Sequence, residues 1–125
     1  MTVVIDSSAL LALIRREPGY ERATAEIRDA LVSPVILAET LGKAARFGFD
    51  IGATDVMLAK AGLRIATIEA GDLRAVAELH ARRERDISLA DRFCLALAMR
   101  LSLPLVTADR PWRDLGLPVE LRYIR

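Results

Sequence analysis

Two patterns of hydrophobic residues alternate along the chain. Short runs of β-branched and aliphatic residues, such as Val3-Val4-Ile5, are typical of buried strands, and longer stretches with apolar residues every three or four positions are typical of helices. The short runs predict strands at residues 2–5, 31–33, 64–68, 104–107 and 119–124. The longer stretches predict helices at residues 7–15, 20–30, 34–47, 53–61, 71–83 and 89–101, with a short one at 109–116.

Residues at the boundaries support this segmentation. Pro18-Gly19 interrupts the helical pattern, Ser33-Pro34 provides an N-cap followed by a proline, and Ser88 caps the last long helix. Strands that alternate with helices indicate an α/β fold, with a mostly parallel sheet covered by helices on both faces. No linker, repeat or low-complexity segment divides the chain, so we expect one domain over residues 1–125.

Composition bounds the function without identifying it. Of the 125 residues, 53% are hydrophobic and 5% aromatic, so the chain can bury a core, and that core must be mainly aliphatic. The formal net charge is +1, so any binding of nucleic acid must come from local charge or from a metal ion. Arginine outnumbers lysine by 16 to 2, which suits phosphate contacts. A GC-rich coding sequence explains that bias equally well.

We expect neither a signal peptide nor a membrane span. The single cysteine, Cys94, excludes an internal disulfide and lies in an apolar helical run, so we expect it in the core. No basic N-terminal segment leads into a long apolar stretch, and no apolar run reaches the roughly 18 residues that a span needs. These features predict a cytoplasmic protein.

Four acidic residues are predicted to meet at one edge of the sheet. Asp6 directly follows the first strand, and Asp109 follows the strand at 104–107 with one residue between. Glu39 and Asp91 lie near the starts of helices that enter from the same edge. Because ligand sites of parallel sheets lie beyond the carboxyl ends of the strands, the four acids are candidates for one pocket.

Such a pocket predicts a divalent cation. Two unit charges about 4 Å apart repel by roughly 4 kcal/mol at an effective dielectric constant near 20. Either raised pKa values or a bound cation must offset that repulsion. Oxygen ligands without nearby histidine or cysteine favour Mg²⁺ or Mn²⁺ over Zn²⁺. A metal of this kind can activate water for attack on a phosphodiester.

Three of the acids also have a structural interpretation. Asp6 and Asp109 are placed to cap the helices that follow them. Asp91 is the third residue after Ser88, a position where acids favour a helix start. None of the three is therefore decisive alone.

Glu39 is the acid that is hardest to explain without a metal. It could pair with Lys43 one turn later, an interaction of only a few tenths of a kcal/mol. Its helical face also carries Val35, Ile36 and Gly42 and looks packed, so an unpaired carboxylate there would be costly.

Four sequence blocks together resemble the PIN-domain pattern of VapC toxins from bacterial toxin–antitoxin pairs. The blocks are Val4-Ile5-Asp6-Ser7-Ser8-Ala9-Leu10, Ala38-Glu39, Ser88-Leu89-Ala90-Asp91 with Phe93, and Val106-Thr107-Ala108-Asp109. Their order, their spacing and the total length agree with the family, and the resemblance covers essentially the whole chain. One block would be weak support, because an aspartate after a strand is common, whereas four in order are specific.

The resemblance implies a fold, an activity and a set of partners. The fold would be a three-layer α/β/α sandwich, and the activity that of a Mg²⁺- or Mn²⁺-dependent endoribonuclease acting on tRNA or rRNA. The implied site consists of the acids Asp6, Glu39, Asp91 and Asp109 with supporting hydroxyls from Thr107 and, with less support, Ser8. Asp6 and Asp91 would be the most direct metal ligands. The implied partners are a VapB-type antitoxin and a second copy of the chain.

A few other residues have both a functional and a structural interpretation. Arg110 and Arg113 follow Asp109 and are candidates for contacts with RNA phosphates, although solvated helix faces explain most arginines equally well. Trp112 suits base stacking, but a core position is favoured. His80 is far in sequence from the acids and is not expected to be catalytic. The apolar helices within 34–63 are candidates for an antitoxin groove or a dimer face.

Three rival functions differ from this interpretation. A phosphoacceptor receiver domain, a regulatory switch, needs paired acids at the first strand and a lysine after the last, and the only lysines are Lys43 and Lys60. A haloacid-dehalogenase-type phosphatase needs Asp-x-Asp, which Asp6-Ser7-Ser8 lacks. A PIN nuclease that processes RNA without an antitoxin stays open.

Overall fold

The computed structural model describes residues 1–82, 87–110, 112 and 116–125. The strands are β1 (Val3–Ile5), β2 (Ala30–Val32), β3 (Arg64–Ile65), β4 (Leu105–Thr107) and β5 (Leu121–Tyr123). The helices are α1 (Ser7–Arg15), α2 (Tyr20–Glu26), α3 (Pro34–Arg46), α4 (Ile51–Lys60), α5 (Ala70–Ala81) and α6 (Leu89–Leu101), with a 3₁₀ turn η1 (Ile27–Asp29). Strands and helices therefore alternate as the sequence predicts.

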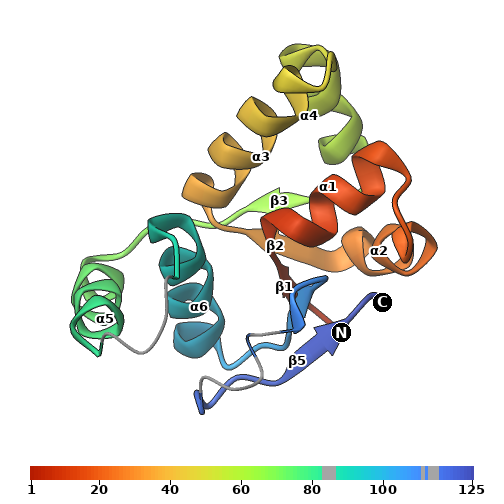
Figure 1. The fold of residues 1–125 in the computed structure, drawn as a ribbon. Helices are drawn as coiled ribbons and strands as arrows, with labels where there is room; N and C mark the ends of the chain where they lie inside the picture. Colours follow the sequence, from red (N-terminus) through yellow and green to blue (C-terminus); the bar gives the residue numbers. More distant parts are fainter. Residues whose placement is uncertain (83–86, 111, 113–115) are drawn as a thin grey trace.

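The strands form one parallel sheet in the order β3-β2-β1-β4-β5. The central strand β1 fixes the register, because Val4 lies opposite both Leu31 of β2 and Leu105 of β4. Figure 1 shows α1 and α2 on one side of this sheet and α5 and α6 on the other. The predicted three-layer α/β/α arrangement is confirmed, and the described sheet is parallel throughout.

The strand order reverses direction between β1 and β4. From β1 the chain moves outward to β2 and β3, and then crosses to β4 on the opposite side of β1. A crevice opens outside the carboxyl ends of the two strands at such a point. Asp6 directly follows β1 and Ala108 alone separates Asp109 from β4, so both acids lie at this crevice.

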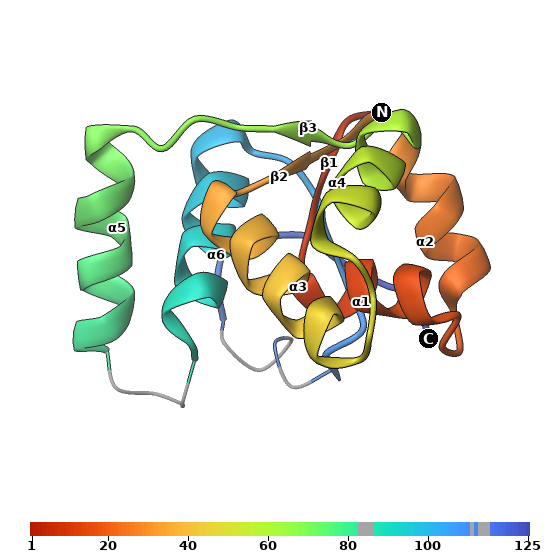
Figure 2. The same ribbon diagram turned by 90° about the horizontal axis from the view of Figure 1, so that it is seen from above.

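The helices that carry the other two acids also meet at this edge. α3 contacts both α1 and α6, and Figure 2 shows α3 lying between them. Glu39 lies on α3 and Asp91 in the first turn of α6. Ser33 caps α3 through Val35 N, and Ser88 caps α6 through Asp91 N, so both helix starts are fixed by serine caps as predicted.

The core is aliphatic, as the composition indicates. Val3, Val4 and Ile5 of β1 are fully buried, as are Leu105 and Val106 of β4. Strands that are covered on both faces are apolar without alternation, which explains why these two runs contain no polar residue before their ends. No helix among the described residues is long and apolar enough to cross a membrane.

Two predicted elements differ from the structure, and a third cannot be compared with it. The helix expected at 20–30 ends at Glu26, because Ala30 pairs with Val3 and belongs to β2. The strand expected at 64–68 is limited to β3, which has only β2 as a neighbour in the described sheet. The short helix expected at 109–116 falls largely outside the described residues.

Candidate active site

Asp6 is buried at the junction of β1 and α1, with an exposed fraction of 1%. Its Oδ1 accepts hydrogen bonds from Ala9 N at 2.9 Å and from the Ser8 hydroxyl at 2.8 Å. The Ala9 contact is the N-cap that the sequence predicts. Its Oδ2 accepts from Thr107 Oγ1 at 2.5 Å and from Ser8 Oγ at 3.0 Å. Both carboxylate oxygens are thus held, and the cap accounts for only one contact.

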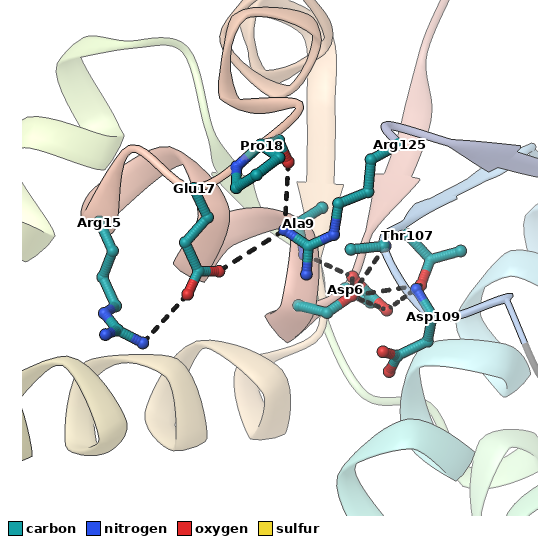
Figure 3. Close-up of polar contacts among 10 residues, drawn as sticks. Asp6, Ala9, Arg15, Glu17, Pro18, Thr107, Asp109 and Arg125 are labelled. Atoms are coloured by element: carbon teal, nitrogen blue, oxygen red, sulfur yellow. Dashed lines mark hydrogen bonds and ion pairs between the residues drawn. The ribbon is translucent and has the colours of Figure 1, made fainter.

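Thr107 and Ser8 tie the ends of β1 and β4 together around this carboxylate. Besides donating to Asp6, Thr107 Oγ1 accepts from Asp109 N at 2.9 Å. Ser8 Oγ accepts from Ala108 N at 2.9 Å. Figure 3 shows Asp6, Thr107 and Asp109 converging from the two strands. Both hydroxyls proposed from the sequence therefore contact the Asp6 carboxylate.

The carboxyl group of Asp6 has a pKa raised from its usual 3.8 to about 7. Burial is the main cause, and the negative charge of Asp109 adds to it. The hydrogen bonds from Thr107, Ala9 and Ser8 lower the pKa but only partly compensate. A buried carboxylate without a neighbouring cation is thus strongly disfavoured, and Asp6 is half protonated near neutral pH.

Asp91 is electrostatically connected to the other acids. Burial is the largest cause of its raised pKa, while the hydrogen bond at Ser88 lowers that pKa. The charges of Glu39 and Asp109 raise it further and the charge of Lys43 lowers it. Asp109 acts on both Asp6 and Asp91. Asp109 therefore lies within electrostatic range of both Asp6 and Asp91, and Glu39 within range of Asp91.

The packed face expected around Glu39 is only partly present: Ile36 is fully buried and Val35 packs against the core, but Glu39 itself is not buried. Its side chain is 28% exposed, and Gly42 on the same helix is exposed. Lys43 Nζ lies 3.1 Å from Glu39 Oε1, so the ion pair proposed as the alternative is formed. Asp6, rather than Glu39, is the acid whose environment most requires a cation.

The four acids suit a hard divalent cation in chemistry but are not gathered into a finished coordination cage. Among the described residues, no three Asp, Glu, His or Cys side chains lie close enough together to hold a metal. The donors at this edge are carboxylate and hydroxyl oxygens, the ligand type preferred by Mg²⁺ and Mn²⁺. Burial is the main cause of the raised pKa values of Asp6 and Asp91, the charges of neighbouring acids add to it, and a cation at this edge would favour the charged forms.

Cys94 lies beneath this edge and belongs to the core. It is fully buried, and its Sγ lies 3.9 Å from the carbonyl oxygen of Ile5. Burial, together with the charges of Asp6 and Asp91, raises the thiol pKa well above its ordinary value. A thiol held protonated is a poor nucleophile, so the predicted core role is confirmed.

The other residues proposed from the sequence lie at several different places in the chain. Arg110 is exposed, donates to the carbonyl oxygen of Arg125 at 2.8 Å and lies 5.3 Å over the ring of Tyr123. Arg113 lies outside the described residues. Trp112 is 8% exposed and packs in the core, the position that the sequence favours over base stacking. His80 is exposed on α5.

Arg125 makes contacts that sequence reasoning did not identify. Its guanidinium donates to the carbonyl oxygen of Pro18 at 3.1 Å and pairs with Glu17 at 3.7 Å. Glu17 in turn pairs with Arg15 at 3.0 Å. Figure 3 shows Arg15, Glu17, Pro18 and Arg125 joined in one row of contacts. No sequence pattern signals the contact, because it joins the last residue to the α1–α2 connection.

Comparison with known proteins extends these observations. Residues 3–117 match the PIN domain family, and no curated protein sequence matches the chain. VapC20 of Mycobacterium tuberculosis, described as a sarcin-ricin loop cleaving toxin, superposes with a TM-score of 0.77 at 19% identity, covering 94% of this chain and 98% of that one.

Two further structures are similar over comparable lengths. A toxin–antitoxin complex from Klebsiella pneumoniae gives a TM-score of 0.73 at 20% identity, covering 94% of this chain and 98% of that one. VapBC2 from Rickettsia felis, bound to a DNA fragment from its promoter, gives 0.75 at 15% identity and covers 98% of each chain. These similarities establish the fold.

Proposed function

Because the chain belongs to the PIN domain family, we propose that it is a metal-dependent endoribonuclease that hydrolyses phosphodiester bonds. The observation that carries the proposal is the buried Asp6 carboxylate at the sheet crevice, with a pKa near 7. The charge of Asp109 raises the pKa of Asp6, and the charges of Asp109 and Glu39 raise that of Asp91. Strongly perturbed carboxylates in a crevice are typical of catalytic sites. The family match over 3–117 also removes the receiver and phosphatase alternatives.

We assign Mg²⁺ or Mn²⁺ to this site. Asp6 and Asp91 would hold the ion directly, and Glu39 and Asp109 would complete its surroundings directly or through water. When bound, such an ion supplies a Lewis acid that activates water and balances the negative charge of the phosphodiester during attack.

The neighbouring side chains preorganise the acids for this role. Thr107 and Ser8 donate to both oxygens of Asp6, which restrains rotation of the carboxylate. Asp91 is fixed by its position in the first turn of α6, where Ser88 accepts its backbone N–H. Lys43 holds Glu39 in one orientation by their ion pair. Because no three of the described acids lie close enough together to hold a metal, a bound ion would have to draw them together.

We further propose that the chain is the toxin of a type II toxin–antitoxin pair. The support is the similarity, over nearly the full length of both chains, to proteins described as toxins or toxin–antitoxin complexes. A VapB-type antitoxin would block the site, the toxin would form a homodimer, and its substrate would be a structured RNA, either tRNA or rRNA. It would act in the cytoplasm.

The proposal is tested by inducing the chain in bacteria and sequencing the 5′ ends of cellular RNA. The parent should arrest growth and create new ends at a few positions in tRNA or rRNA. Asp91→Asn should do neither, whereas Asp55→Asn, a change at an exposed acid on α4, should behave as the parent does. Unchanged RNA ends in cells that accumulate soluble parent protein would contradict the proposal.

A further inference from the structure

A pocket lies at the C-terminal end of α3, separate from the four acids. It has a volume of about 400 Å³ and is lined by Lys43, Arg46 and Phe47. Phe47 is 54% exposed although it is a large apolar residue. Arg46 is also exposed and, among the described residues, has no ion-pair partner. Exposed apolar surface bordered by cations indicates a binding surface rather than part of the core.

A third cation, from α1, is stacked on the same aromatic ring. The Arg15 guanidinium carbon lies 3.6 Å from the centroid of the Phe47 ring, within the range of a cation–π contact. Glu17 holds Arg15 from the other side at 3.0 Å and also pairs with Arg125. The Arg15 guanidinium therefore contacts both Phe47 and Glu17, and Phe47 keeps more than half of its surface exposed.

The pocket adjoins the acids along one face of α3. Glu39, Lys43 and Phe47 follow one another at intervals of four residues, which places them on the same side of the helix. The Glu39–Lys43 ion pair joins the acid cluster to the pocket. Eight residues of α-helix rise about 12 Å, which is the span of a few nucleotides at roughly 3.4 Å for each stacked nucleotide.

We propose that this Phe47 pocket binds a nucleotide of the RNA substrate a few positions from the scissile phosphate, an inference that rests on the proposed ribonuclease function. A base would stack on the exposed part of the Phe47 ring, and Arg46 would contact an adjoining phosphate. Aromatic rings combined with a cationic groove are the usual way to bind single-stranded nucleic acid without reading its sequence. Lys43 and Arg15 pair with Glu39 and Glu17. Within the part of the chain that the structure describes, Arg46 is therefore the cation at this ring that is free to contact a phosphate, and its charge favours this occupant over an apolar peptide segment.

The test measures RNA binding without cleavage. Fluorescence anisotropy of a labelled single-stranded oligoribonucleotide is followed with the Asp91→Asn protein in EDTA, so neither metal nor turnover contributes. Adding Phe47→Ala should weaken binding about tenfold, and Phe47→Trp should restore it. Arg46→Glu should also weaken binding and reduce its salt dependence. Arg74→Glu makes the same charge change on the exposed face of α5 and should bind RNA as the Asp91→Asn protein does.

The outcomes separate this inference from the proposed function. If the parent cleaves RNA but Phe47→Ala and Arg46→Glu leave the affinity unchanged, the nucleotide pocket is wrong and the nuclease stands. If Phe47→Ala abolishes binding of an antitoxin but not of RNA, the pocket takes a protein and the inference is overturned. A parent that neither binds nor cleaves RNA overturns both proposals.

Discussion

The hydroxyl of Thr107 lies 2.5 Å from Oδ2 of Asp6. This hydrogen bond joins the ends of β1 and β4, the two strands between which the strand order reverses. The same hydroxyl accepts the backbone N–H of Asp109. One side chain therefore orients one acid and positions the backbone of another. This arrangement explains why a threonine at the end of β4 belongs to the site even though it carries no charge.

Replacing Thr107 with valine should damage the site without changing its volume much. The substitution removes the donor to Asp6 and leaves the partly buried N–H of Asp109 without its acceptor. A hydrogen bond to a charged group contributes about 1.5–3 kcal/mol, so stability in urea at pH 8 should fall by about that amount. RNA cleavage should fall at least tenfold. Thr107→Ser should recover most of both losses, and equal activity of the valine variant would contradict the role assigned to the hydroxyl.

Stability of the metal-free protein should depend on pH through Asp6. Because the folded-state pKa is raised from 3.8 to about 7, the folded protein binds more protons than the unfolded chain between these values. The contribution of Asp6 to stability therefore falls as the pH rises from about 4 to about 7, and then stays constant. The full difference is about 4 kcal/mol.

Asp6→Asn isolates that contribution. In EDTA at pH 8 the variant should be more stable than the parent by about 2–4 kcal/mol, and the difference should shrink steadily towards pH 4. The neighbouring hydroxyls can satisfy an amide, so the fold should be preserved. Asp55→Asn serves as the control and should follow the parent at every pH. A parent–variant difference that does not change with pH would show that the Asp6 carboxyl is not perturbed.

A divalent cation should stabilise the parent protein. An ion that binds only the folded state raises stability by about 2.7 kcal/mol at 100 times its dissociation constant. Thermal unfolding at pH 8 should therefore shift upward with Mn²⁺, and less so at pH 5.5, where protons compete for Asp6. Asp91→Asn should reduce the shift strongly. An unchanged melting temperature in millimolar Mn²⁺ would argue against a site of useful affinity.

The sequence predicted the parts of this molecule that depend on local patterns. The continuous apolar runs that became β1 and β4 and the serine caps of α3 and α6 are local signals, and they locate the edge at which the acids lie. The end of α2 was not predictable in this way, because the pairing of Ala30 with Val3 depends on a distant strand. The same holds for the contact of Arg125 with the α1–α2 connection.

The relative importance of the acids also required the structure. Local spacing indicated that Glu39 was the unusual carboxylate, yet its exposure and its contact with Lys43 make it an ordinary helix ion pair. In the sequence, Asp6 looks like an ordinary N-cap. In the structure, β4 and Thr107 bury it, and burial raises the pKa of its carboxyl group to about 7. Burial is a property of tertiary packing, so no single-sequence pattern could distinguish these two cases.

Cleavage of RNA by the purified protein tests the central claim most directly. End-labelled tRNA and rRNA fragments are incubated with Mn²⁺ or with excess EDTA, using the parent, Asp6→Asn, Asp91→Asn and Asp55→Asn. We predict discrete cleavage by the parent and by Asp55→Asn in Mn²⁺, at least a hundredfold loss in Asp6→Asn and Asp91→Asn, and none in EDTA. Cleavage that persists in EDTA, or that survives both acid substitutions, would contradict a metal-dependent nuclease built on these carboxylates.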